Sequence, residues 1–436
     1  MMPTRWYRPV TVLAAGRDQM NLVKTSLLNG IAVVIKMATL LGINKILAIY
    51  VGPAGYAAIG QFQNAVQMVT TFASGAINTG VTKYTAEFYD DAERQHKVWQ
   101  TACMVVLIGS IVVGGAVALL SKPLAVWFLK EESYGSVFIW FASTLIFFTF
   151  NTLLLAILNG KKAIGRYVAA NIAGSLFALI VTAAMSISMG LYGALVALAI
   201  YQSCTFFVTV TICYRADWFK WKYIIGGIDG NVARGLLKYT AMALTTAACV
   251  PLSHIFIRNH LSLQFGLEQA GYWEAMWRLS SAYLMFVTAT LSVYYLPRLA
   301  ELKTAASLRQ EIHLGYKLIL PIAFMSSLAV YLLRDMIIAI LFSDEFLPMR
   351  DLFAIQMIGD FLRIGSLLLS YIMLSKSMPK AFILTEIAFA ASFYFLTIFM
   401  TATYGLQGVV IAHAINYLIY WLIMIFLIYL RIEEIA

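Results

Sequence analysis

Long apolar runs separated by short polar segments dominate this chain. Twelve of these runs are long enough to cross a bilayer as helices, which takes about 20 apolar residues. They lie at residues 22–50, 55–80, 98–120, 136–158, 167–189, 191–213, 239–258, 270–296, 318–341, 351–374, 381–402 and 405–430. The pattern predicts an all-α polytopic membrane protein with about twelve transmembrane helices.

The two halves of the chain resemble each other. The turn GLYG at 190–193 recurs as GLQG at 405–408, and an Ala-x-Ala-Ile run at 197–200 recurs at 412–415, both at an offset of 215. An offset of 214 relates earlier positions, pairing Lys24 with Lys238 and Glu87 with Glu301. The repeat predicts two pseudo-symmetric bundles of six helices, in parallel orientation, with the substrate site between them.

Basic residues are distributed unevenly over the loops. If twelve spans are correct, the loops on the side of the two termini hold eighteen Lys and Arg residues, and the opposite loops hold four: Lys122, Lys130, Arg258 and Arg350. Cytoplasmic loops carry the excess of positive charge in membrane proteins. Both termini are therefore predicted to be cytoplasmic.

The predicted organisation follows from the spans and the repeat. It comprises a cytoplasmic tail or mis-assigned start at residues 1–19, a six-helix bundle at 20–213, a basic and aromatic cytoplasmic linker at 214–238, a second six-helix bundle at 239–430 and a cytoplasmic tail at 431–436. The linker either lies in the lipid headgroup region or is an ordinary basic loop.

Composition agrees with a membrane protein. The chain of 436 residues is 61% hydrophobic and 12% charged, with a mean hydropathy of +0.81. The net charge of +10 is explained by the basic loops, so nucleic-acid binding is not needed to account for it. The four cysteines show no spacing typical of a metal site or a disulfide framework. No metal, no cofactor and no catalytic residue is expected.

Lys36 is the most informative charge within the spans. It lies twelve residues beyond Lys24, roughly 18 Å deeper along a helix, where a lysine costs about 2.5–3.5 kcal/mol. It has no acidic partner within helical reach on its own span. We therefore expect Lys36 to meet an anion. Lys45 lies near the outer end of that span, where its amine can reach the interface.

Glu274, Arg278, Asp360, Arg363 and Glu386 also lie well inside predicted spans. Glu274 and Arg278 are four positions apart, and Asp360 and Arg363 are three apart, so each pair shares a helix face and is able to neutralise itself. Glu386 is alone on its span, which leaves pairing with Lys36 or Arg363, or transfer of a coupling ion. His254 and His413 are interpreted as hydrogen-bonded core residues. The candidate substrate-binding cations are Lys36, Arg278 and Arg363, and the candidate coupling or charge-pair residues are Glu274, Asp360 and Glu386.

Several stretches resemble a known family. The run LLRDMIIAILFSDEFLPMRDLFAIQMIGDFLRIG at 332–365 resembles the Wzx-type flippases of lipid-linked oligosaccharides, which include O-antigen translocases and the lipid III flippases of enterobacterial common antigen. The same likeness appears in GPAG at 52–55, GVTKY at 80–84 and SVYYLP at 292–297, and it extends from residue 20 to the end of the chain.

This resemblance implies a fold and a function. The fold is that of the multidrug, oligosaccharidyl-lipid and polysaccharide exporter superfamily, whose two bundles open alternately to each side. The function is translocation of an oligosaccharide on undecaprenyl pyrophosphate, from the cytoplasmic to the periplasmic leaflet of the bacterial inner membrane during lipopolysaccharide or common-antigen biosynthesis. The implied partners are the substrate, membrane lipid and, on the periplasmic side, a polymerase with its chain-length regulator.

Two energy sources and two rival functions stay open. Energy comes either from an H⁺ or Na⁺ gradient or from consumption of the product by the polymerase, and the sequence does not choose. An ion-coupled drug exporter of the same fold is expected to have an acidic cavity for cationic substrates. A membrane-embedded glycosyltransferase or polymerase is expected to have a large outer loop, and the outer loops here are short.

Overall fold

The computed structural model describes residues 12–291, 295–302, 304–376 and 378–435. Over these ranges the regular secondary structure is entirely helical. The helices of the first half are α1 (Val12–Tyr50), α2 (Gly52–Ser74), α3 (Asn78–Glu87), α4 (Ala92–Leu119), α5 (Ser121–Leu129), η1 (Glu132–Tyr134), α6 (Gly135–Gly160) and α7 (Ile164–Tyr214). The first eleven residues of the predicted N-terminal tail lie outside the described residues, and the rest of it begins α1.

A short helix, α8 (Trp221–Ile224), lies within the predicted linker. The second half consists of α9 (Gly230–Phe265), α10 (Leu267–Thr290), α11 (Leu296–Glu301), α12 (Ala305–Leu332), α13 (Arg334–Leu341), η3 (Asp344–Leu352), α14 (Phe353–Ser375), α15 (Pro379–Tyr404) and α16 (Gln407–Ile435). The linker does not stand apart from the first half, because Phe219 and Ile224 are buried in a core cluster with residues of α4 and α6.

The predicted spans coincide with these helices. Eight helical stretches of the described chain are long and apolar enough to cross a membrane, namely those of α1, α4, α6, α7, α12, α14, α15 and α16. The other predicted spans fall on α2, α9 and α10, which carry buried polar and charged side chains. The molecule is thus a multi-pass membrane protein, and the count of twelve crossings stays a prediction, as does the cytoplasmic position of the termini.

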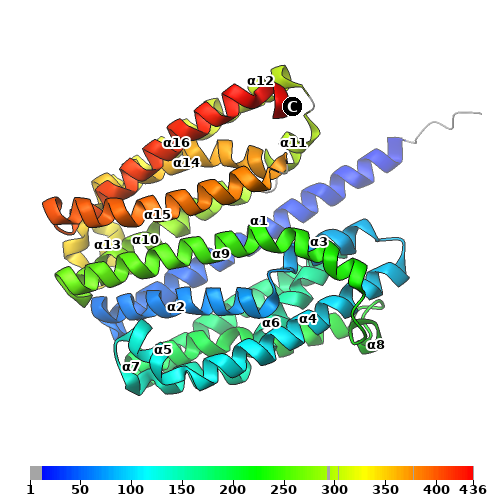
Figure 1. Ribbon diagram of the computed structural model, residues 1–436, viewed down its shortest axis with the longest axis horizontal. Coiled ribbons are helices and arrows are strands. Elements are labelled where there is room, and N and C mark those ends of the chain that lie inside the picture. The colour runs from blue at the N-terminus through cyan, green and yellow to red at the C-terminus, as the bar shows by residue number, and fades with distance from the viewer. Residues whose placement is uncertain (1–11, 292–294, 303, 377, 436) are drawn as a thin grey trace, which may run out of the picture.

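Four turns gather at one end of the molecule, on the left of Figure 1, and we call this end the glycine-turn end. Each is built on a glycine with positive φ, at Gly52, Gly190, Gly266 and Gly405. Gly190 interrupts α7 with non-helical angles, so this 51-residue helix contains the two predicted spans 167–189 and 191–213. Glycine is favoured in these turns because a Cβ atom is disfavoured at positive φ.

The main core that the two halves share lies near the glycine-turn end. One cluster, the shared cluster, joins Tyr56 and Phe62 of α2 to Trp273 of α10 and Phe346 of η3. The other described clusters are one that combines first-half residues with Leu236 of α9 and two that lie within the second half. In Figure 1, α12 and α14–α16 incline away from α2–α7 toward the end where α11 and α3 lie.

Small residues allow the halves to approach closely at the glycine-turn end. A Cβ atom on Gly271 would lie 1.8 Å from the carbonyl oxygen of Pro53, and one on Gly60 would lie 2.4 Å from the carboxylate of Glu274. Glycine thus brings the backbones of α2 and α10 together, as small residues do between membrane helices. Lys45 of α1 adds hydrogen bonds across the halves, since its Nζ donates to the carbonyl oxygens of Ala339 (3.0 Å) and Phe342.

Candidate functional site

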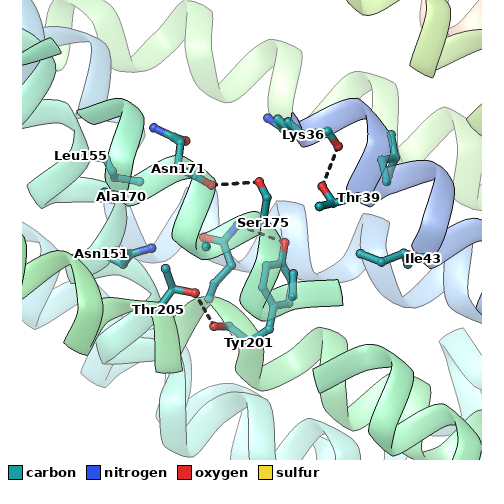
Figure 2. Close-up of a pocket in the computed structure, with 14 residues that line it drawn as sticks. Lys36, Thr39, Ile43, Asn151, Leu155, Ala170, Asn171, Ser175, Tyr201 and Thr205 are labelled. Atoms are coloured by element: carbon teal, nitrogen blue, oxygen red, sulfur yellow. Dashed lines mark hydrogen bonds between the residues drawn. The ribbon is translucent and has the colours of Figure 1, made fainter. Parts of the chain in front are cut away.

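Lys36 lies in a pocket within the first half, which we call the Lys36 pocket (Figure 2). Its volume is about 180 Å³, and α1, α6 and α7 form its walls. The lining residues include Lys36, Thr39, Asn151, Asn171, Ser175, Tyr201, Gln202 and Thr205. In Figure 2 the side chain of Lys36 extends from α1 toward Asn171 and Ser175 on α7.

The Lys36 pocket is cationic. Its lining contains amides, hydroxyls and apolar groups but no carboxylate. Within the described part of the chain, the Nζ atom of Lys36 has no ion-pair partner at 4.0 Å or less, and the side chain is exposed. An unpaired lysine beside neutral hydrogen-bonding groups suits an anion. The sequence placed this site between the bundles, whereas the structure places the pocket inside one of them.

Arg363 and Glu386 line a second pocket, which we call the Glu386 pocket. It lies in the second half, has a volume of about 230 Å³ and is formed by α9, α10, α14, α15 and α16. Its lining residues include Ser253, His254, Trp277, Arg363, Ser370, Thr385, Glu386, Phe389, Phe393, Asn416, Tyr417 and Tyr420. Aromatic rings thus surround one carboxylate and one guanidinium group.

The guanidinium of Arg363 contacts rings rather than a carboxylate. Its central carbon lies 4.9 Å from the ring centre of Trp277 and 5.6 Å from that of Tyr417. Its Nη1 atom is buried and has no hydrogen-bond partner among the described residues. No described ion pair at 4.0 Å or less joins Arg363 to Glu386. Of the alternatives that the sequence left open for Glu386, pairing with Lys36 is wrong, because the two residues line different pockets.

The predicted pair of Asp360 and Arg363 is also wrong. Asp360 is fully buried and accepts hydrogen bonds from Ser280 (2.6 Å), Tyr283 (2.6 Å) and Gln356 (3.1 Å). Nε2 of His413 also lies 3.1 Å from its Oδ1 atom. These contacts occupy both carboxylate oxygens, so Arg363 turns toward the rings instead. The expectation that His413 is a hydrogen-bonded core residue is confirmed, whereas His254 packs edge-on against Trp277.

The predicted pair of Glu274 and Arg278 is confirmed and belongs to a larger network. Nε of Arg278 lies 2.7 Å from Oε1 of Glu274, and the other carboxylate oxygen contacts Arg258 of α9. Across the halves, Arg258 donates to Gln61 (2.6 Å) and Arg278 donates to Gln63 (2.6 Å). We call Arg258, Glu274 and Arg278 with these two glutamines the interhalf network.

Arg258 is the site residue that sequence reasoning missed. The sequence assigned it to an outer loop, but the structure places it inside α9 with 1% of its side chain exposed. Without it the loops predicted to be outer hold three basic residues rather than four. The signal in the sequence was weak, because Leu261, Leu263 and Phe265 alternate with polar residues after Arg258.

The three predicted substrate-binding cations therefore lie in three different environments. Lys36 lines a pocket of the first half, Arg363 lines a pocket of the second half, and Arg278 is held in the interhalf network. Of the three, Arg278 is the least available in this conformation, since a carboxylate and two amide side chains surround it.

The chain is similar to a known protein family and to two curated proteins. Residues 22–303 match the family described as polysaccharide biosynthesis protein. The chain is 29% identical over 405 residues to the lipid III flippases of Escherichia coli (strain K12) and Shigella flexneri, covering 92% of this chain and 97% of each relative.

Solved structures show the same fold at low identity. An inward-facing multidrug resistance MATE family transporter of the MOP superfamily matches with a TM-score of 0.76 at 14% identity, covering 92% of this chain and 94% of that one. The lipid II flippase MurJ, in its inward closed conformation, matches with a TM-score of 0.70 at 13% identity, covering 94% of this chain and 90% of that one.

Proposed function

Because the chain belongs to the polysaccharide biosynthesis protein family, we propose that it is a flippase that moves a lipid-linked oligosaccharide between the leaflets of a membrane. The relatives named as lipid III flippases align over nearly their whole length. The observation that carries the proposal is the Lys36 pocket, in which a cation without a described ion-pair partner lies at the depth of a membrane span. A pyrophosphate that crosses hydrocarbon needs such a charge.

Transport proceeds by alternating access of the two halves. The shared cluster closes the glycine-turn end, while toward the other end the described core around α11, α12, α14 and α16 is separate from that of the first half, which Leu236 at the start of α9 joins. Opening the glycine-turn end separates α2 from α10 and breaks the polar contacts of the interhalf network. Hydrogen bonds that water can replace make this separation less costly than pulling apart an entirely apolar contact.

Lys36 supplies positive charge for the pyrophosphate, and Arg363 contacts the substrate in the other half. Arg278 becomes available when the interhalf network opens, because its contacts with Gln63 and Asn44 cross the halves. The prenyl tail stays in lipid throughout, so only the charged and sugar groups require a polar path.

An ion-coupled drug exporter of the same fold is the alternative. The fold itself does not distinguish the two functions, since MATE transporters and a flippase both match it. The charge of the pockets favours the flippase, because the Lys36 pocket contains no carboxylate to attract a cationic drug. The Glu386 pocket also contains an arginine.

The proposal also includes the protein's location, the direction of transport and the energy source. We place the protein in the bacterial inner membrane, acting as a transporter rather than an enzyme, with transport from the cytoplasmic to the periplasmic leaflet. A polymerase with its chain-length regulator then consumes the product. Coupling to an H⁺ or Na⁺ gradient through Glu274, Asp360 or Glu386 is the alternative to this pull by consumption.

Reconstitution tests the function directly. Purified protein in proteoliposomes is expected to speed the movement of a fluorescently labelled lipid-linked oligosaccharide between leaflets, measured by quenching from outside. Empty liposomes provide the control. Complementation of strains that lack their own flippase then identifies the glycan. Movement no faster than in empty liposomes, together with failure in every strain, would overturn the proposal.

A further inference from the structure

The two pockets occupy equivalent positions in the internal repeat. Asn171 of the Lys36 pocket and Glu386 of the other pocket are 215 positions apart, the offset found in the sequence. The same offset relates further lining residues: Leu155 to Ser370, Ala170 to Thr385, Ser175 to Ala390 and Tyr201 to Asn416. On α1 and α9 the offset is 214, which relates Lys36 to Val250 and Thr39 to Ser253. Each half thus contains one pocket in the same place.

The side chains of the two pockets differ at most paired positions, and Tyr201 of the Lys36 pocket corresponds to the amide of Asn416. Four small or polar residues of the Lys36 pocket are replaced by aromatic rings in the Glu386 pocket: Gly174 by Phe389, Ala178 by Phe393, Gln202 by Tyr417 and Thr205 by Tyr420. The lysine is replaced by a valine, and an amide is replaced by the carboxylate of Glu386. The first pocket therefore presents a cation with neutral polar groups, and the second presents rings with a carboxylate and a guanidinium.

These two sets of groups suit different parts of one substrate. A pyrophosphate is repelled by a carboxylate and attracted by an unpaired lysine. A sugar ring has apolar C–H faces, which pack on aromatic rings, and a rim of hydroxyl or amide groups, which need acceptors and donors. Glu386 supplies acceptors, while the buried Nη1 of Arg363 is a donor without a partner in the described structure.

We infer that the Glu386 pocket is a sugar subsite that holds one ring of the oligosaccharide, while the Lys36 pocket holds the phosphate. This inference rests on the proposed function. The pocket volume of about 230 Å³ is below the roughly 300–1,000 Å³ of sites for drug-sized ligands, so it suits a single ring rather than a complete glycan. Tyr417 and Phe389 flank the ring, and Glu386 accepts hydrogen bonds from its rim.

Binding of two lipids to the purified protein tests the inference. The probes are a polyprenyl pyrophosphate without sugar and the same lipid carrying an N-acetylated hexosamine, and affinity is measured for both in lipid nanodiscs. Wild-type protein is expected to bind the glycosylated lipid more tightly. Glu386→Gln and Tyr417→Ala are expected to weaken binding of the glycosylated lipid roughly tenfold or more and to leave the sugar-free lipid unchanged.

Matched variants separate a subsite from a structural effect. Tyr417→Phe keeps the ring and is expected to retain most of the preference for the glycosylated lipid. Leu384→Ala, on the exposed face of the same helix as Glu386, is expected to change neither affinity. Lys36→Gln is expected to weaken binding of both lipids. Unfolding temperatures of all variants identify any that are misfolded.

Each contrary outcome has a distinct meaning. If Glu386→Gln and Tyr417→Phe fold and the glutamine variant weakens both lipids equally or neither, the sugar subsite is overturned while the proposed function stands. If Glu386→Gln abolishes the dependence of transport on Na⁺ or H⁺ without changing the preference for the glycosylated lipid, Glu386 is a coupling residue. The inference is then also wrong. If wild-type protein binds neither lipid, the proposed function itself fails.

Discussion

Gly190 and Gly405 lie 215 positions apart and adopt the same backbone conformation, with φ and ψ of 56° and −135° at Gly190 and 58° and −143° at Gly405. Three residues later, Gly193 and Gly408 pack on the backbone of Met185 and Met400, which are also 215 apart. The internal repeat is therefore visible in the backbone itself. Each half turns back on itself at the same kind of glycine.

These turns predict equal costs of substitution in the two halves. Gly190→Ala and Gly405→Ala are each expected to lower the free energy of unfolding by about 1–3 kcal/mol, because this combination of angles is accessible essentially only to glycine. Gly115→Ala provides the control, since a Cβ atom there meets nothing within 4 Å and lies in a helix. Thermal unfolding in detergent measures the difference. Unchanged stability of both turn variants would contradict the backbone assignment.

Substitutions of the charged residues in the interhalf network are expected to lower the stability of the protein by unequal amounts. Glu274→Gln leaves Arg258 and Arg278 buried without their carboxylate, so it is expected to destabilise the protein by about 3–5 kcal/mol. Arg258→Met is expected to cost less, because Arg278 still pairs with Glu274. The double variant Arg258→Met/Glu274→Leu is expected to be milder than the sum of its single changes.

An exposed pair provides the control for this series. Lys122 and Glu132 are 2.8 Å apart on the surface, and Lys122→Ala is expected to change the unfolding temperature little. If Lys122→Ala costs as much as Glu274→Gln, burial is not the cause of the effect.

Substitution of Lys36 is expected to reduce transport without reducing stability. Lys36→Gln is expected to slow flipping in proteoliposomes roughly ten- to hundredfold, the effect of losing a hydrogen bond to a charged group. Lys36→Arg retains the charge and is expected to be intermediate. The unfolding temperature is expected to stay unchanged, because the Lys36 side chain is exposed and has no described ion-pair partner. A wild-type rate for Lys36→Gln would exclude the proposed role.

The contact between α1 and the segment after α13 predicts a crosslink that stops transport. Oγ of Ser343 lies 3.3 Å from the carbonyl oxygen of Ala48. In a variant without the four native cysteines, Ala48→Cys/Ser343→Cys joined by a short, reducible bifunctional thiol reagent is expected to abolish flipping, and reduction is expected to restore it. Each single cysteine variant is the control. Flipping by the crosslinked protein would show that the glycine-turn end need not open.

The sequence by itself determined the features that depend on neighbours along one helix. The apolar runs located the helices, the recurring glycines located the repeat, and the spacing of four placed Glu274 and Arg278 on one face. These inferences succeed because helical periodicity fixes which side chains within a segment can touch. The resemblance to lipid-linked oligosaccharide flippases rested on such local runs as well, and the relatives found by comparison agree with it.

Only the tertiary structure decided which helices meet and how each is rotated. Asp360 and Arg363 have the right spacing to pair. Instead, hydroxyl groups of α10 and an amide of α14 itself donate hydrogen bonds to Asp360, and aromatic rings surround Arg363. Arg258 finds its carboxylate sixteen positions away across a turn. Lys36 and Arg363 lie in separate pockets because each half encloses its own. A buried charge requires a partner, but the packing of helices distant in sequence selects that partner.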